Sequence, residues 1–395
     1  MHVTLAEGIN WVGAIDWKVR DFHGYETVRG STYNAYLVQG EKTALIDTVK
    51  APFADTLLHN VSEVVGLDAV DYVVANHGEP DHSGALPAVM AACPNATLVT
   101  NDRCAGILES YYGPREWPMQ TVATGDSLDL GGRTLSFVQV PMVHWPDSMV
   151  TYCAEERILF SNDAFGQHLA SSGRFDDEVE FAEVMHEAKT YYANIVMLYG
   201  RPIAKALEAL GGLQIAMIAP AHGVIWREHV PEILDAYNDW VRCRPRAKLL
   251  VIYQSMWGST DAMAHEILAG ALGHGAEIKL LEVGSTGRTV IATEVLDAAV
   301  LAVGSPTLNM TLMPEVASVL TYLKGLAPKN KAGMAFGSYG WAPSGPKEVH
   351  AALEEMGLEM LGEPLTAHWR PDDETRARCR EAGRMLAEHA ARAAV

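Results

Sequence analysis

The sequence predicts an α/β protein of two domains, an α/β sandwich in residues 1–246 followed by a doubly wound parallel sheet in residues 247–395. Its 395 residues are too many for one hydrophobic core. In the first half, short β runs alternate with turns and break off at histidine or aspartate residues. In the second half, which begins sharply after "RCRPRAK", strand, loop and helix patterns follow one another three times. These three observations together predict two domains.

Composition places the chain among ordinary globular proteins and excludes several roles. Apolar residues make up 49% and charged residues 20%, as in a typical soluble domain. The formal net charge of −19 disfavours binding to nucleic acid or to an anionic membrane, because both need a basic surface. No run approaches the roughly 18 apolar residues that a membrane span needs, and the N-terminus shows no secretion signal. We therefore expect a cytoplasmic protein.

The cysteines do not form a metal or disulfide framework. There are five of them, an odd number, and none stands in C-x-x-C spacing. Any metal chemistry must therefore come from histidine, aspartate and glutamate.

The first half reads as a series of short strands. The stretch "NAYLVQGEKTALIDTV" predicts a strand, a turn containing glycine and a second strand. Further strands are expected in "AVDYVVANH", "ATLVTN", "LSFVQVPMVH", "MVTYCAEERILFSND" and "AMIAPAHG", and helices at Glu183–Leu198 and Val230–Arg242. Polar residues at the C-terminal ends of strands are where an α/β sandwich places its site.

The second half predicts buried parallel strands. Its three repeats begin at "KLLVIY", "AAVLAVG" and "KAGMAFG", apolar runs that are short enough to be fully covered strands. In a doubly wound sheet, ligands lie at the carboxyl ends of such strands.

A constellation of possible metal ligands follows the strands of the first half. Four members lie within "ANHGEPDHSGAL", and the others end the runs "FVQVPMV", "RILFSN" and "IAPA". The candidate ligands are His77, Glu79, Asp81, His82, His144, Asp163 and His222.

This pattern resembles the metallo-β-lactamase fold, an αββα sandwich in which such strand ends meet at a two-metal site. Zinc hydrolases of that fold place a histidine where this chain has Glu79. A carboxylate there makes the site harder and more anionic, which favours iron because the added charge stabilises the higher oxidation state. The resemblance implies two sets of iron ligands: His77, Glu79 and His144 for one, Asp81, His82 and His222 for the other, and Asp163 as a bridge. Proteins of this pattern differ in whether the histidine at the position of His82 binds the metal.

Two further residues are candidates for a supporting catalytic role. His168, five residues beyond Asp163, could donate a proton into the site, and Tyr191 could do so from the predicted helix. A tyrosine in a helix also serves as amphipathic packing.

The loop "QSMWGSTD" between the first strand and first helix of the second half suits a phosphomonoester. Its hydroxyls and a helix expected to begin near Ala262 offer donors to phosphate, while the loop contains neither Gly-Lys-Ser/Thr nor G-x-G-x-x-G. Two more loops, "GSPTLNMTLMP" and "FGSYGWAPSG", follow at strand ends, with aromatic residues to flank a flat ring. We expect an FMN site of flavodoxin type. The candidate residues are Ser255, Met256, Trp257, Gly258, Ser259, Thr260, Pro306, Thr307, Leu308, Asn309, Ser338, Tyr339, Gly340 and Trp341.

A domain carrying H-x-E-x-D-H followed by a flavodoxin-like domain resembles the flavodiiron proteins along essentially the whole chain. "HGEPDHSG", "PAHGVIWR" and "YQSMWGST" carry the resemblance as a set. It implies reduction of O2 to water or of NO to N2O with two irons and FMN, in a head-to-tail homodimer or a dimer of dimers. It also implies the minimal form of the family, whose electrons come from a separate donor such as rubredoxin or reduced coenzyme F420.

Two other functions remain open at this point. A dinuclear zinc hydrolase with a flavodoxin-like sensor domain would share the fold, although Glu79 argues against it. The chain could also be an electron carrier whose metal site is vestigial, but the complete set of seven candidate ligands argues against this function.

Overall fold

The structure is a computed structural model that describes residues 1–393. The chain divides into two compact units. Residues 1–192 and 199–238 form the first unit, and residues 193–198 form the second together with the chain from Asp239 onward. The two-part α/β fold is confirmed; a domain boundary at residues 246–247 stays a prediction.

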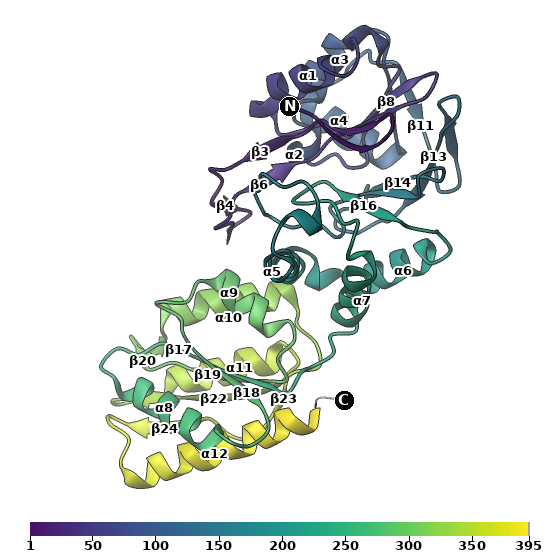
Figure 1. Cartoon of the computed structure of the whole chain (residues 1–395). Helices are drawn as coiled ribbons and strands as arrows, with labels where there is room; N and C mark the ends of the chain where they lie inside the picture. Colours follow the sequence, from purple (N-terminus) through teal and green to yellow (C-terminus); the bar gives the residue numbers. More distant parts are fainter. Residues whose placement is uncertain (394–395) are drawn as a thin grey trace. The chain divides into compact units, whose positions relative to one another are not determined.

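The first unit is an αββα sandwich (Figure 1). Its larger sheet has seven strands in the order β1-β2-β7-β8-β9-β10-β11, and its second sheet has five in the order β12-β13-β14-β15-β16. The strands of the larger sheet are β1 (Val3–Ala6), β2 (Ile9–Trp11), β7 (Tyr36–Gln39), β8 (Thr43–Ile46), β9 (Tyr72–Val74), β10 (Thr97–Thr100) and β11 (Met119–Thr121). Those of the second are β12 (Ser127–Asp129), β13 (Thr134–Gln139), β14 (Met149–Cys153), β15 (Ile158–Asn162) and β16 (Met217–Pro220). The small pairs β3 (Ala14–Asp16) with β6 (Ser31–Tyr33) and β4 (Asp21–Phe22) with β5 (Tyr25–Glu26) complete the β structure of this unit.

Alternation along the strands builds two cores in this unit. Leu37 and Leu45 point to the helices that cover the larger sheet, whereas Val38 and Ile46 point into the space between the sheets. Because successive side chains of a strand face opposite ways, a fully apolar strand serves both cores. The continuous apolar runs of the sequence have this cause.

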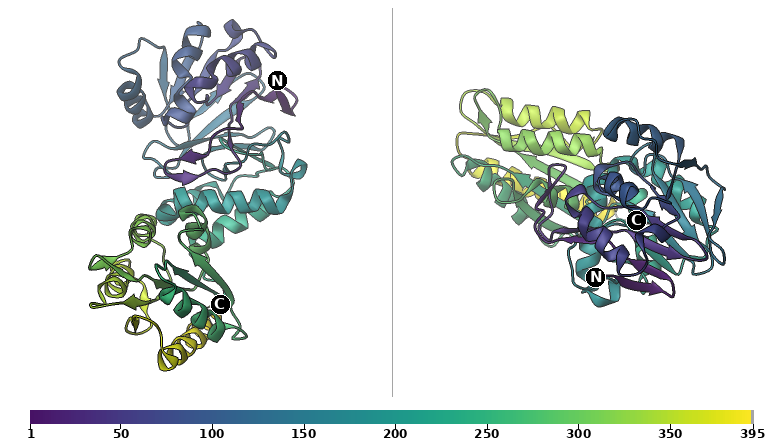
Figure 2. Two further views of the ribbon diagram at one scale, coloured as in Figure 1. Left: turned by 90° about the vertical axis from the view of Figure 1, so that its left-hand side faces the viewer. Right: turned by 90° about the horizontal axis from the view of Figure 1, so that it is seen from above.

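Helices cover both outer faces of the sandwich, as the left view of Figure 2 also shows. The helices of the first unit are α1 (Ala54–Ser62), α2 (Pro80–Ser83), α3 (Leu86–Ala92), α4 (Asp102–Tyr112), α5 (Phe181–Tyr191), α6 (Gly200–Leu210) and α7 (Val230–Val241). The helix expected at Glu183–Leu198 is α-helical only as far as Tyr191 and continues as a π-helical turn, Tyr192–Val196. The helix expected from Val230 ends at Val241, one residue earlier than predicted.

The second unit is a parallel sheet of doubly wound type. Its order is β18-β17-β19-β22-β23, with β24 also beside β22, and every pairing is parallel. The strands are β17 (Lys248–Tyr253), β18 (Glu277–Glu282), β19 (Val300–Gly304), β22 (Ala332–Tyr339), β23 (Glu359–Met360) and β24 (Leu365–His368), with a hairpin of β20 (Thr307–Leu308) and β21 (Thr311–Leu312). Helices α8 (Ser259–Ala271) and α12 (Asp373–Ala393) cover one face, and α9 (Arg288–Val295), α10 (Pro314–Leu326) and α11 (Ser344–Glu355) cover the other (Figure 1). The predicted sheet is confirmed.

Helix α8 begins at Ser259, three residues before the predicted start near Ala262. Gly258 has a φ of +79°, a conformation that glycine adopts without strain, and it turns the chain directly into the helix. Ser259 and Thr260 therefore stand in the first helical turn. Within residues 1–393, no helix is long and apolar enough to cross a membrane.

Candidate metal centre and flavin pocket

All seven predicted metal ligands come together at one edge of the sandwich. His77 follows β9, His144 follows β13, Asp163 follows β15 and His222 follows β16. Glu79 is the residue before helix α2, which carries the other two. Strands of both sheets end here, so residues up to 145 positions apart in sequence, His77 and His222, reach one site.

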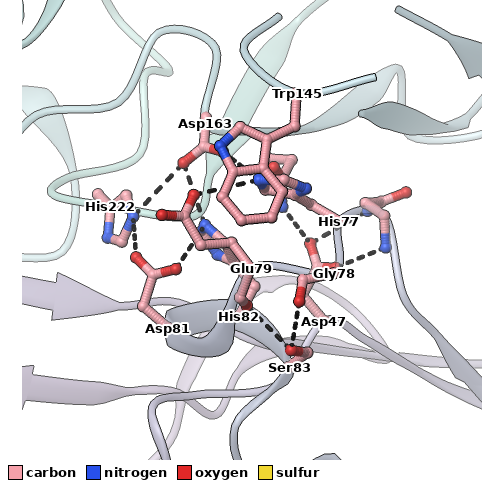
Figure 3. A network of polar contacts seen from close by, with 12 residues as sticks. Asp47, His77, Gly78, Glu79, Asp81, His82, Ser83, Trp145, Asp163 and His222 are labelled. Carbon is pink, nitrogen blue, oxygen red and sulfur yellow. Dashed lines mark hydrogen bonds and ion pairs between the residues drawn. The ribbon is translucent and has the colours of Figure 1, made fainter. Parts of the chain in front are cut away.

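The seven side chains form two groups with Asp163 between them, and Figure 3 labels all of them except His144. In the first group, Nε2 of His77 and Nε2 of His144 lie 3.2 and 3.1 Å from Oε2 of Glu79. In the second group, Nε2 of His222 lies 3.2 Å from Oδ2 of Asp81. The members of the two groups are His77, Glu79, His144 and Asp163, and Asp81, His82 and His222.

Asp163 divides its two oxygens between the groups. Oδ2 lies 3.6 Å from Nε2 of both His77 and His144. Oδ1 lies 3.1 Å from Nε2 of His82 and 3.5 Å from Nε2 of His222. A carboxylate placed in this way can bridge two metals, and His82 faces the same centre as the other imidazoles.

Several buried atoms at this centre have no hydrogen-bond partner. They are both carboxylate oxygens of Asp81, Nε2 of His82 and Oδ2 of Asp163. They lie 3.1–3.6 Å from other members of the two groups, without regular hydrogen-bond geometry, whereas buried polar atoms normally have a hydrogen-bond partner. Cations between the two groups would satisfy all of them, so the residues fit a dinuclear metal centre. Nitrogen and oxygen donors without thiolate suit iron.

The pKa shifts reflect a dense cluster of opposite charges. Burial raises the pKa of Asp163, but the imidazoles of His82 and His222 outweigh burial and hold this pKa well below its usual range. Burial lowers the pKa of His222, while Asp163 and Asp81 act the other way and raise it to about 10. The carboxylates therefore stay ionised and available as ligands at neutral pH.

The two predicted supporting residues lie against this centre. The Tyr191 hydroxyl donates a hydrogen bond of 2.9 Å to Oδ1 of Asp163, and burial raises the tyrosine pKa well above its usual value. His168 is buried, with Nδ1 2.7 Å from the Ser31 hydroxyl and its ring 4.8 Å from that of His222. Burial and the nearby imidazole of His222 hold the pKa of His168 well below its usual range, so this ring is neutral at pH 7. Their catalytic roles stay predictions.

Sequence reasoning missed three residues that touch the ligand set. Nε2 of His23, on the β4–β5 hairpin, lies 2.7 Å from Oε1 of Glu79. The ring centroid of Phe22 lies 6.0 Å from that of His222, and Oδ2 of Asp147 lies 3.0 Å from Nδ1 of His77. His23 and Phe22 stand in a polar hairpin without periodicity. Of the three, only Asp147 was marked in the sequence, because it stands three residues after the candidate ligand His144.

The second unit contains a pocket of about 420 Å³ at the carboxyl ends of its strands. It is lined by Met256, Trp257, Ser259, Pro306, Thr307, Leu308, Asn309, Ser338, Tyr339, Gly340, Trp341, Ala342, Trp369 and Arg370. Of the predicted FMN residues, Ser255, Gly258 and Thr260 do not line it. Thr260 instead lies beneath it, with Oγ1 2.9 Å from Oγ of Ser338.

The pocket has the features that a flavin mononucleotide needs. Trp257 and Trp341 are 87% and 80% exposed, so their ring faces are available for stacking. Ser259 lies in the first turn of α8, where backbone N–H groups favour a phosphate. Ala342 lies within the quoted loop "FGSYGWAPSG" but was not among the candidates, and Trp369 and Arg370 were missed because no loop motif marks the segment after β24.

Comparisons with known proteins agree with both halves of this description. The family model described as "ODP family beta lactamase" matches residues 32–223, and the model described as "Flavodoxin" matches residues 251–383. The nitric oxide reductase of Moorella thermoacetica is 44% identical over 98% of each chain. The solved rubredoxin oxygen:oxidoreductase from Desulfovibrio gigas superposes with a TM-score of 0.97 at 38% identity, covering 100% of this chain and 99% of the other. The flavodiiron protein from Giardia intestinalis gives the same TM-score and identity over 100% and 98%.

Fold and site together define an FMN-binding protein with a dinuclear iron centre in a metallo-β-lactamase fold. The chain belongs to the flavodiiron protein family.

Proposed function

We propose that the protein reduces O2 to water, NO to N2O, or both, with electrons that pass from an external donor through FMN to a diiron centre. The observation that carries this proposal is the pair of ligand groups sharing Asp163, with Glu79 as a carboxylate ligand of one group. The names of the relatives, nitric oxide reductase and rubredoxin oxygen:oxidoreductase, support these substrates and rubredoxin as a donor. They give no support to a zinc hydrolase.

The electron count fits the proposed reaction. Two ferrous ions and one reduced FMN together supply four electrons, which reduce one O2 to two waters with four protons, or four NO to two N2O and two waters.

The chain's own residues position and shield this centre. The Tyr191 hydroxyl keeps its proton and donates a hydrogen bond to Oδ1 of Asp163, which orients that carboxylate between the two ligand groups. Nε2 of His23 holds a proton 2.7 Å from Oε1 of Glu79, and its side chain is 58% exposed, so it connects the centre with solvent. Phe22 packs against the rings of His168 and His222 and excludes water from that side.

We also propose a cytoplasmic location and a head-to-tail homodimer, alone or as a dimer of dimers. All five cysteines are free and buried, which suits a reducing compartment. The exposed rings of Trp257 and Trp341 at the flavin pocket would be covered in such an assembly. Light scattering of the FMN-loaded protein tests the dimer, and a monomer at micromolar concentration would exclude it.

Metal and flavin content of anaerobically purified protein test the function most directly. We expect two irons and one FMN per chain. Two zincs without iron, after growth in iron-rich medium, would contradict the proposal and restore the hydrolase.

Ligand variants connect the metal with turnover. Asp163→Ala and His144→Ala should abolish gas reduction and leave the FMN absorption spectrum unchanged, because neither residue lies in the flavin pocket. His59→Ala, which removes a histidine that is 67% exposed and away from the ligand groups, is the matched control and should retain full turnover. Turnover that survives in Asp163→Ala would remove the diiron assignment.

A further inference from the structure

A buried carboxylate stands directly behind one of the proposed ligands. The Asp147 side chain is 0% exposed, and its Oδ2 lies 3.0 Å from Nδ1 of His77. The same oxygen accepts a hydrogen bond of 2.7 Å from the backbone N–H of Gly78. Its other oxygen, Oδ1, is buried and accepts no hydrogen bond of regular geometry.

The surrounding chain holds Asp147 in place independently of any metal. Asn101, the N-cap residue of helix α4, donates from Nδ2 to the carbonyl oxygen of Asp147 at 2.7 Å. A Cβ at Gly78 would stand 2.7 Å from Ile107 Cγ2 and 3.3 Å from Asp147 Oδ2, so the approach of this backbone requires glycine. The carboxylate is thus fixed against the ligand loop.

The contact determines what His77 offers to a metal. A carboxylate only accepts hydrogen bonds, so Nδ1 of His77 carries the proton and Nε2 keeps its lone pair for the metal. In the other group, His222 is oriented in the same way by the backbone carbonyl of Thr32, 2.8 Å from its Nδ1. Both partners set a tautomer, but only Asp147 carries a charge.

The directly coordinating charges do not distinguish the two metals. Each group has one carboxylate of its own, Glu79 or Asp81, and they share Asp163. The difference therefore lies in the groups behind the ligands.

Other charged groups near the ligands act on them less directly than Asp147 does. His23 faces Glu79 but is 58% exposed, so water screens its charge. The buried carboxylate of Asp47 accepts hydrogen bonds from Asn76 and Asn162. The charge of His82, in the other group, lowers the pKa of Asp47, but no hydrogen bond joins Asp47 to a ligand imidazole. Asp147 has the direct, unscreened contact.

We propose that Asp147 makes the two irons unequal, by stabilising the ferric state of the metal held by His77, Glu79 and His144. Asp147 is thereby a positioning and tuning residue that sets the order in which the two metals are reduced, the metal beside His222 first. This inference rests on the proposed diiron function and deepens it.

Asp147→Asn isolates the charge. An asparagine oxygen in the place of Oδ2 accepts both hydrogen bonds, from His77 and Gly78, and its NH2 group takes the place of Oδ1, which accepts no hydrogen bond of regular geometry. Asp147→Ala removes both bonds together with the charge. Asp176→Asn is the matched control, because Asp176 is buried and accepts backbone hydrogen bonds from Arg227, Glu228 and His229 without touching a proposed ligand.

The readout is an anaerobic redox titration of the iron-loaded protein, followed by the EPR signal of the half-reduced diiron centre. In Asp147→Asn, preference for ferric over ferrous iron at the His77 group should fall about tenfold, which raises the lower potential by about 59 mV. The upper potential should change less, so the half-reduced signal reaches a lower maximum. Asp176→Asn should keep both potentials.

The outcomes separate the possible roles. An unchanged lower potential in fully iron-loaded Asp147→Asn, with iron lost only in Asp147→Ala, would mean that Asp147 merely orients His77, and would overturn the proposal. Should Asp147→Asn fail to fold by circular dichroism, Asp147→Ser removes the same charge and should show the same rise. The proposed function is tested separately, by the metal content of the wild-type protein, so its failure is distinguishable from a failure of the Asp147 proposal. Zinc in place of iron in the wild type would overturn both.

Discussion

Replacing Tyr191 by phenylalanine removes one hydroxyl from the wall of the metal centre. That hydroxyl donates at 2.9 Å to Oδ1 of Asp163 in a fully buried setting, and the high pKa of Tyr191 keeps the proton in place at all physiological pH values. A hydrogen bond to a charged group contributes about 1.5–3 kcal/mol. At about 1.4 kcal/mol per factor of ten, losing this hydrogen bond corresponds to a roughly 10- to 100-fold lower rate constant.

We therefore expect Tyr191→Phe to reduce the rate constant for O2 or NO reduction by about 10- to 100-fold with iron and FMN content unchanged. The assay is the initial rate of gas consumption at an electrode, with the flavin kept reduced and the metals quantified in the same sample.

Tyr237→Phe is the matched control for this prediction. The Tyr237 hydroxyl is also buried in the first unit, but it accepts a hydrogen bond of 2.8 Å from the backbone N–H of Phe165, whereas the Tyr191 hydroxyl donates to a proposed ligand. It should lose about 1 kcal/mol of stability and keep its turnover. A wild-type rate in iron-replete Tyr191→Phe, or an equal loss of rate in Tyr237→Phe, would refute the reasoning.

Three further predictions concern the flavin, the thiols and the metals. Thr260→Val removes the hydroxyl that contacts Ser338 beneath the flavin pocket, and it should weaken FMN binding about 2- to 13-fold, as measured by fluorescence titration. The control Thr293→Val, which loses a hydrogen bond to a helix carbonyl, should leave FMN binding unchanged. Burial raises the pKa of Cys93 and Cys379 to about 11, so alkylation of these two thiols in the native protein should be slow at pH 8 and should rise toward pH 11. Rapid labelling of either thiol at pH 8, located by peptide mapping, would contradict this. Removing both metals with a chelator should lower the melting temperature of the first unit by roughly 10–20 °C, since each metal at 100 times its Kd stabilises by about 2.7 kcal/mol. Calorimetry showing no shift would contradict a cluster of buried carboxylates that depends on cations.

Much of the site could be anticipated because the chemistry recurs at strand ends. His144, Asp163 and His222 each follow a continuous apolar run, and parallel or stacked strands bring such ends to one edge whatever their separation in sequence. The three loops of the second unit obey the same rule. The three strand, loop and helix repeats of the second half followed from periodicity and turn residues.

Other features depend on contacts that leave no periodic signal. His23 reaches Glu79 from a short hairpin, and the start of α8 depends on the φ of one glycine, Gly258. Arg370 lines the flavin pocket from a loop that no motif marks.

The sequence by itself determined the fold class, the seven candidate ligands and the carboxylate character of Glu79, because local pattern and donor chemistry are properties of the residues alone. Only the tertiary structure decided that Asp163 turns one oxygen to each ligand group and that Asp147 backs His77 while a neutral carbonyl backs His222. Those relations are distances between atoms that are 70 or more residues apart, for Asp147 and His77 as for His222 and Thr32. Folding sets such distances through the packing of two sheets, and the order of residues along the chain does not encode them locally.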